Sequence, residues 1–66
     1  SYPEIKKVQS ITSSPVGYKY MIFIVICVDG NMSTFDSHNL ADSVEKSVSN
    51  LDNVYKAIIH VEPMKS

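Results

Sequence analysis

The sequence predicts a small α+β domain in which a three-stranded mixed sheet is covered by one helix. Three observations carry this prediction. Residues 18–28 are dominated by β-branched and aromatic residues, which favour strands. Residues 33–51 repeat apolar side chains at helical spacing, and residues 54–61 return to strand-like composition. Because a helix between two strands of one sheet makes a right-handed crossover, the order strand, strand, helix, strand implies a sheet with both parallel and antiparallel pairs.

The composition is that of a globular protein near the lower size limit for folding without staples. The 66 residues are 44% hydrophobic and 20% charged, so we expect residues 1–66 to form a single domain. Six basic and seven acidic residues give a net charge of −1, which predicts no nucleic-acid partner. No apolar run approaches the roughly 20 residues that a membrane-spanning helix needs. The chain also lacks an initiator methionine and can be a fragment of a longer protein.

The first two strands are expected to form a hairpin. Residues 7–12 alternate weakly between apolar and polar, as a half-buried strand does. Residues 13–17 have turn chemistry, because Pro15 presets φ and Gly17 permits a positive φ. In the second strand, Tyr18 and Tyr20 flank Lys19, and the neutral charge of the chain favours ordinary strand packing for them over stacking on nucleic acid. This strand is apolar on both faces, with Tyr20, Ile22, Ile24 and Ile26 on one and Met21, Phe23, Val25 and Cys27 on the other.

The helix and the last strand have recognisable ends. Ser33 is a candidate N-cap, and Asp36 suits the positive end of the helix dipole. The helix should end at Ser49–Asn50, and Pro63 should stop the last strand, which begins at Val54. The apolar stripe of the helix comprises Leu40, Ala41, Val44, Val48 and Leu51.

One helix covers only one face of a three-stranded sheet. The second apolar face of residues 18–28 therefore predicts a self-association surface, or contact with an element outside this fragment. Cys27 is the single cysteine, so no internal disulfide can form. It lies on this second face within an apolar run and is expected to be a buried, unreactive thiol.

The candidate chemistry is that of a metal site. His60 and Glu62 are two residues apart on a strand and project from the same face. His38 lies in the first turn of the helix, beside Asp42. Imidazole and carboxylate groups suit a divalent transition metal, although a solvated strand face and a surface histidine explain the same spacing. No nucleophile-elbow or phosphate-loop glycines are present, so no catalytic residues and no enzyme activity are predicted.

Three stretches resemble the cytoplasmic C-terminal domain of cation diffusion facilitator transporters, the zinc/proton antiporters. They are IKKVQSITSSPVG at 5–17, SHNLADSVE at 37–45 and IIHVEP at 58–63. The resemblance implies a metallochaperone-like (ferredoxin-like) fold, here ββαβ because the family's N-terminal helix is largely missing. It also implies a fragment of a membrane transporter that lies on the cytoplasmic side of the cell membrane and forms a homodimer beneath its own membrane domain.

The resemblance further implies which residues bind metal. His38, His60 and Glu62 match family ligands, whereas Lys6 (or Lys7) and Val25 stand where relatives often carry two more histidines. A single site completed by water or by the other protomer is then expected. Its metal would be zinc in the first place, with iron, manganese, cobalt or cadmium as alternatives and no bound metal as another. In the family, metal at the dimer interface favours transport by the membrane part.

Other classes remain open at this point. One is a small-molecule sensing module of the ACT type, for which Ser13-Ser14-Pro15 makes a poor ligand loop. An enzyme of tautomerase size would need a catalytic N-terminal proline, and Pro3 is not terminal. The last is a domain of the same family that dimerises without metal.

Overall fold

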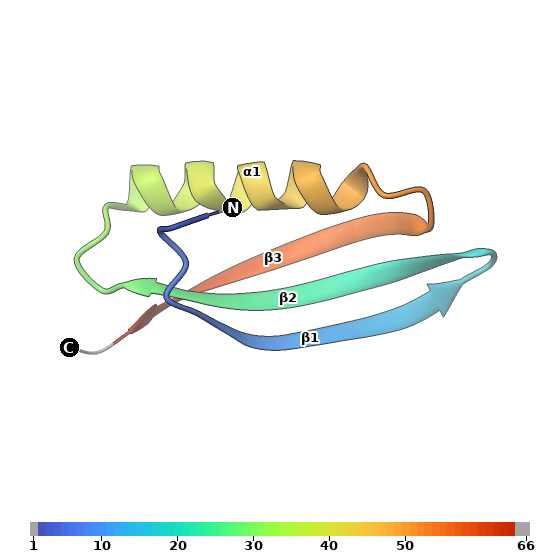
Figure 1. Cartoon of the computed structure of the whole chain (residues 1–66), viewed down its shortest axis with the longest axis horizontal. Helices are drawn as coiled ribbons and strands as arrows, with labels where there is room; N and C mark the ends of the chain where they lie inside the picture. The colour runs from blue at the N-terminus through green and yellow to red at the C-terminus, as the bar shows by residue number, and fades with distance from the viewer. Residues whose placement is uncertain (1, 65–66) are drawn as a thin grey trace.

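The computed structural model describes residues 2–64 and shows a three-stranded sheet with one helix on one face (Figure 1). The sheet order is β1-β2-β3, with β1 antiparallel and β3 parallel to the central strand β2. The predicted order of elements and the mixed sheet are confirmed. The elements are β1 (Lys7–Val16), β2 (Lys19–Asp29), α1 (Thr34–Ser49) and β3 (Val54–Met64).

The turn predicted over residues 13–17 is mostly wrong. Strand β1 continues to Val16, and Pro15 pairs with Tyr20 of β2. A proline has no N–H to give to a ladder, but β1 is an edge strand and tolerates it there. The hairpin turns within two residues, Gly17 and Tyr18, and the φ of Gly17 is +62°, which few other residues adopt.

The prediction that Pro63 stops the last strand is also wrong, for the same reason. Strand β3 is the other edge of the sheet and continues to Met64, which pairs with Asp29 at the end of β2. The neighbouring Gly30 lies so close to this strand that an added Cβ would stand 2.8 Å from the Met64 carbonyl oxygen. Only a glycine fits there without a shift of β3, so the turn into the helix is pressed against the strand end.

The predicted ends of the helix are confirmed. The Ser33 side-chain oxygen accepts a hydrogen bond from the Asp36 N–H at 3.0 Å and satisfies one of the free donors of the first turn. Asp36 lies in the first turn and Lys46 in the last. Each charge is opposite in sign to the nearby end of the helix dipole and so stabilises the helix. The helix ends at Ser49 and Asn50 caps it. No helix among residues 2–64 is long and apolar enough to cross a bilayer.

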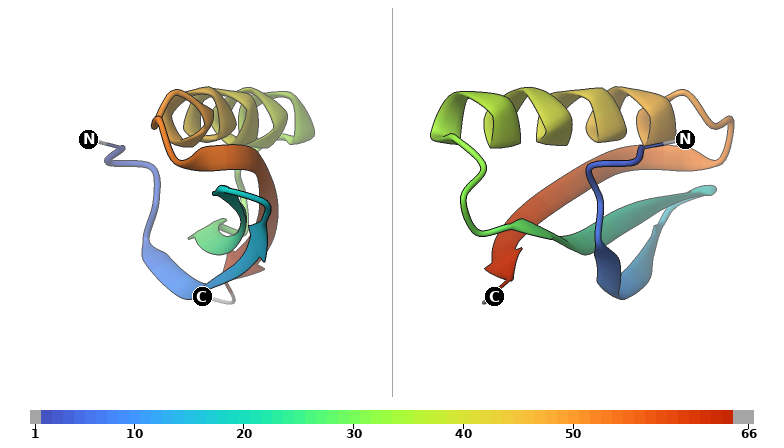
Figure 2. Two further views of the ribbon diagram at one scale, coloured as in Figure 1. Left: turned by 90° about the vertical axis from the view of Figure 1, so that its right-hand side faces the viewer. Right: turned by 60° about the vertical axis from the view of Figure 1, so that its left-hand side comes forward.

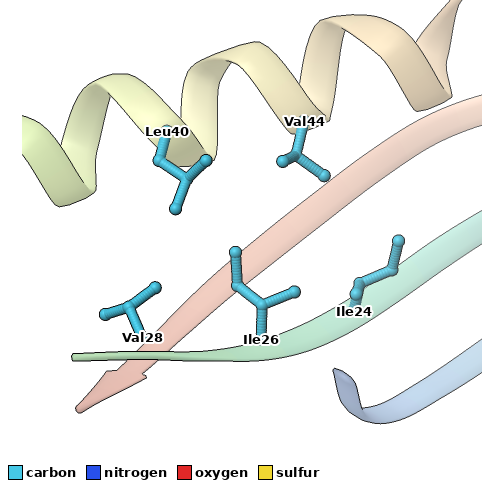
Figure 3. Close-up of a cluster of buried hydrophobic side chains, with 5 residues drawn as sticks. All are labelled: Ile24, Ile26, Val28, Leu40 and Val44. Carbon is cyan, nitrogen blue, oxygen red and sulfur yellow. The ribbon is translucent and has the colours of Figure 1, made fainter. Parts of the chain in front are cut away.

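The core lies between α1 and the face of the sheet that it covers, which we call the covered face (Figure 3). Ile26 is its centre, with 1% of its surface exposed. Ile59 and Val61 of β3 also pack against this cluster, as the alternation predicted for residues around His60. The buried cluster comprises Ile24, Ile26 and Val28 of β2 with Leu40 and Val44 of α1.

The opposite face has no covering element in the described part of the chain (Figure 2), and we call it the bare face. On it, 40% of Phe23 and 38% of Ile58 are exposed. Cys27 is 6% exposed, so the predicted buried thiol is confirmed. What covers this face in the working protein stays a prediction. The bare face consists of Met21, Phe23, Val25 and Cys27 of β2 and Lys56, Ile58, His60 and Glu62 of β3.

Candidate metal site

Two side chains on the bare face of β3 meet. His60 and Glu62 point from the same side of the strand, and the Nε2 atom of His60 contacts the Oε2 atom of Glu62 directly. The side chains are 54% and 45% exposed, so an ion in solution can reach both. An imidazole nitrogen and a carboxylate oxygen are ligand types that a zinc-like cation accepts, and a cation bound to both would replace their direct contact. Both residues thus fit a divalent metal, as half of a four-coordinate shell.

The two positions at which the resembling family often has further histidine ligands lie beside this pair in the sheet. Val25 lies directly opposite His60, and Cys27 lies opposite Glu62. On the other side of β2, Lys7 lies opposite Cys27 and so belongs to the same row as Glu62. A valine side chain has no donor atom for a metal, and the positive charge of a lysine opposes a cation. The surroundings of the pair therefore limit it to two ligands from this sheet.

His38 lies apart from the pair. It belongs to α1, on the opposite side of the sheet from the bare face, and its side chain is 74% exposed. Its Nε2 atom is 3.4 Å from an oxygen of Asp42, one turn further along the helix. Within residues 2–64, no three His, Cys, Asp or Glu side chains stand close enough to hold one metal ion. A shell that includes His38 as well as His60 therefore requires a second protomer.

Sequence reasoning missed the neighbours of the pair on β1. The register of β1 shifts between Val8 and Ser10, which leaves Gln9 in a bulge. The Cys27 thiol donates a hydrogen bond to the Gln9 side-chain oxygen at 3.3 Å. Alternation along β2 placed Cys27 on the second face, but nothing local in the sequence shows that it lies opposite Glu62. In this arrangement the Cys27 thiol is bonded to Gln9 and does not act as a metal ligand.

The pair is exposed on the sheet surface and lies outside the groove beside α1. A groove of about 410 Å³ runs between the N-terminal segment and the first half of α1, and its lining includes neither His60 nor Glu62. One wall of this groove is Tyr2, whose hydroxyl group bonds to the Ser43 carbonyl oxygen at 3.2 Å and to the Ser47 hydroxyl group at 2.6 Å. The metal candidate and the groove are therefore separate features on opposite sides of the sheet.

The comparisons with known proteins agree on one protein family. Residues 1–64 match the family model described as cation efflux protein, cytoplasmic domain. No curated protein matches the chain. Among solved structures, the chain is 33% identical to the metal-bound C-terminal domain of the CzcD transporter from Thermotoga maritima, with a TM-score of 0.89. This similarity covers 98% of the present chain and 77% of the other.

Two further structures share the fold. The cytosolic domain of a cation diffusion facilitator family protein is 33% identical, with a TM-score of 0.85 over 96% of this chain and 76% of that one. A cadmium form of a MamM C-terminal domain variant is 17% identical, with a TM-score of 0.86 over 96% and 80% of the two chains. At that lower identity the similarity shows the fold alone, which is the metallochaperone-like fold that the sequence predicted.

Proposed function

The chain belongs to the cation efflux protein family as its cytoplasmic domain, and on that premise we propose that it is a regulatory, dimerising module that binds a divalent cation through His60 and Glu62. The observation that carries the proposal is the direct contact between these two side chains on the bare face. Family membership also sets aside the ACT-type sensor and the tautomerase-like enzyme, because this family consists of transporter domains and not of enzymes.

Zinc is the metal we propose in the first place. Zn²⁺ binds nitrogen and oxygen ligands, usually four of them in a tetrahedral arrangement, and its filled d shell imposes no other geometry. The CzcD domain from Thermotoga maritima is described as metal-bound, and MamM variants have copper, cadmium and nickel forms. These names support divalent metal binding in general. The choice of zinc among them rests on the family resemblance, because an imidazole nitrogen and a carboxylate oxygen suit several of these metals.

The missing ligands are proposed to come from a second protomer or from water. His60 and Glu62 supply two positions, and His38 of the other protomer is the candidate for a third, since His38 cannot reach the pair within its own chain. The bare face also exposes Phe23 and Ile58, which a second protomer would remove from water. Metal and partner would thus bind to the same face of the sheet.

A shared face makes metal binding and self-association thermodynamically linked. If a cation binds better when two protomers are close, then it must also strengthen their association by the same factor. A domain of this kind shifts its population toward the closed pair when metal rises, and a membrane part joined to it would respond. This linkage is the proposed basis of regulation.

Calorimetric titration with Zn²⁺, Mn²⁺, Fe²⁺ and Co²⁺ tests the site. We expect His60→Ala and Glu62→Ala to lose most of the binding heat. His38→Ala should weaken binding only in the dimeric fraction of the protein, because His38 is proposed to reach the site of the other protomer. Asp52→Asn is the matched control, because Asp52 lies in the turn between α1 and β3, at the other end of β3 from the pair. Unchanged binding by His60→Ala would refute the ligand assignment. Absence of binding by the wild-type chain would instead leave a domain that dimerises without metal.

A further inference from the structure

The end of the molecule farthest from the His60–Glu62 pair carries a cluster of exposed aromatic and aliphatic side chains. The molecule is elongated, with extents of 40 × 18 × 18 Å, and the β1–β2 hairpin and the α1–β3 turn lie together at one end (Figure 1). A hydrogen bond from the Tyr20 N–H to the Asn53 carbonyl oxygen, at 2.9 Å, joins them. We call this cluster the aromatic tip; it comprises Val16, Tyr18, Tyr20, Leu51 and Tyr55.

The tip is exposed to an extent that packing does not explain. Tyr18 is fully exposed at the hairpin turn, and Tyr55 and Leu51 are 62% and 57% exposed. Ordinary strand packing was expected for Tyr18 and Tyr20, and it fails for Tyr18 because the hairpin extends beyond the helix (Figure 1). Three of the four tyrosines of the protein lie here. A tyrosine ring with its hydroxyl group suits a boundary that is apolar on one side and wet on the other.

The two ends of the molecule differ in charge. At the tip, Lys19 and Lys56 accompany the carboxylate of Asp52, and the neighbouring Glu45 and Lys46 at the end of α1 add no net charge. The end with the metal candidate carries Glu4, Asp29, Asp36 and Glu62, against Lys6 and Lys7 at the start of β1. The lysines are scattered along the sequence, and the fold brings two of them to the aromatic tip. The tip is therefore the end that an anionic surface attracts.

We propose that the aromatic tip docks on the anionic headgroups of a lipid bilayer. Tyrosine is enriched where proteins meet the membrane–water interface, and each lysine near an anionic bilayer raises association about five-fold. The chain is the cytoplasmic domain of a membrane efflux protein, so a bilayer lies close to it. The inference is independent of the metal site.

Fluorescence tests the docking directly, because the protein contains no tryptophan. Tyr18→Trp places a single reporter at the tip. The control is Phe35→Trp, at the start of α1 on the other end of the molecule, where 74% of Phe35 is exposed. We expect vesicles of phosphatidylcholine and phosphatidylglycerol to shift the Tyr18→Trp emission to the blue and to leave Phe35→Trp unchanged. High salt should reverse the shift, because it screens charges at an exposed surface.

Other outcomes would overturn the proposal. No shift with the anionic vesicles, or an equal shift for Phe35→Trp, would exclude docking by the tip. A shift that needs no vesicles and grows with protein concentration would identify a second copy of the chain as the occupant. Lys19→Glu with Lys56→Glu, in the Tyr18→Trp background, should weaken vesicle binding by an order of magnitude or more. Unchanged vesicle binding in that variant would contradict the role given to charge.

Discussion

The two faces of the sheet are built from the same strands but differ in what lies over them. On the covered face, α1 buries Ile24, Ile26 and Val28 of β2, and Ile26 is 1% exposed. On the bare face Met21, Phe23 and Val25 of β2 are also apolar, yet Phe23 is 40% exposed. The packing of α1 thus explains the burial of the covered face, whereas Cys27, the one buried residue of the bare face, is bonded to Gln9 of β1. The face left without such an element also holds the histidine and glutamate that converge.

Along β3, residues that stabilise the fold alternate with residues that are proposed to bind metal. Ile59 and Val61 of β3 pack on the core, while His60 and Glu62 between and beside them face outward. Changes on the covered face should therefore act on folding, and changes on the bare face should act on metal and partner binding.

The largest expected effect is a core truncation, compared with the same truncation on the bare face. Ile26→Ala should lower the free energy of unfolding by about 2–5 kcal/mol, because it removes a buried side chain and leaves a cavity. Ile58→Ala should cost less than about 1 kcal/mol, because Ile58 is 38% exposed and already meets water. Urea unfolding of dilute, metal-free protein, followed by circular dichroism, measures both. Equal losses would show that the bare face is packed after all.

The covered face was open to prediction from sequence, and the bare face only in part. Leu40 and Val44 at helical spacing and the alternation around His60 were sufficient to orient α1 and β3 on one core. The strand ends were misjudged at Pro15 and Pro63, because a proline stops a central strand and not an edge strand, and the edges depend on the whole sheet.

The pairing of His60 with Glu62 could be predicted from the sequence, but the residues that surround the pair could not. The two-residue spacing of His60 and Glu62 fixes their shared face in any strand. The opposition of Val25 to His60 and of Cys27 to Glu62 depends on the register of a parallel pair joined through a helix, which no local pattern encodes. The separation of His38 from the pair likewise follows only from the side of the sheet on which α1 packs.

The second prediction adds a ligand to the bare face. Val25→His places an imidazole directly opposite His60, so zinc should bind more tightly by on the order of tenfold, or about 1.4 kcal/mol. Phe23→His is the control, because Phe23 lies opposite Ile58 and one step along the strand from the pair. Competition with a chromophoric chelator measures the affinities. An equal gain from both substitutions would mean that added histidines bind metal anywhere on this face.

The smallest expected effect concerns the cap that holds the covering helix. Ser33→Ala removes the acceptor of the Asp36 N–H and should cost about 1 kcal/mol. Ser37→Ala is the matched control, because the Ser37 hydroxyl group only donates to the Thr34 carbonyl oxygen one turn earlier in the helix. Thermal unfolding of the two variants compares them. Zinc affinity should be the same in both, and a drop confined to Ser33→Ala would connect the helix to the bare face.

The central claim is that metal and a second protomer bind to the same face through His60. Sedimentation equilibrium gives the dissociation constant of the dimer with and without Zn²⁺, for the wild-type chain and for His60→Ala. We predict that zinc lowers this constant in the wild type, and that His60→Ala removes the zinc effect without changing the metal-free value. A dimer constant that zinc leaves unchanged in the wild type, or lowers equally in His60→Ala, would contradict the claim.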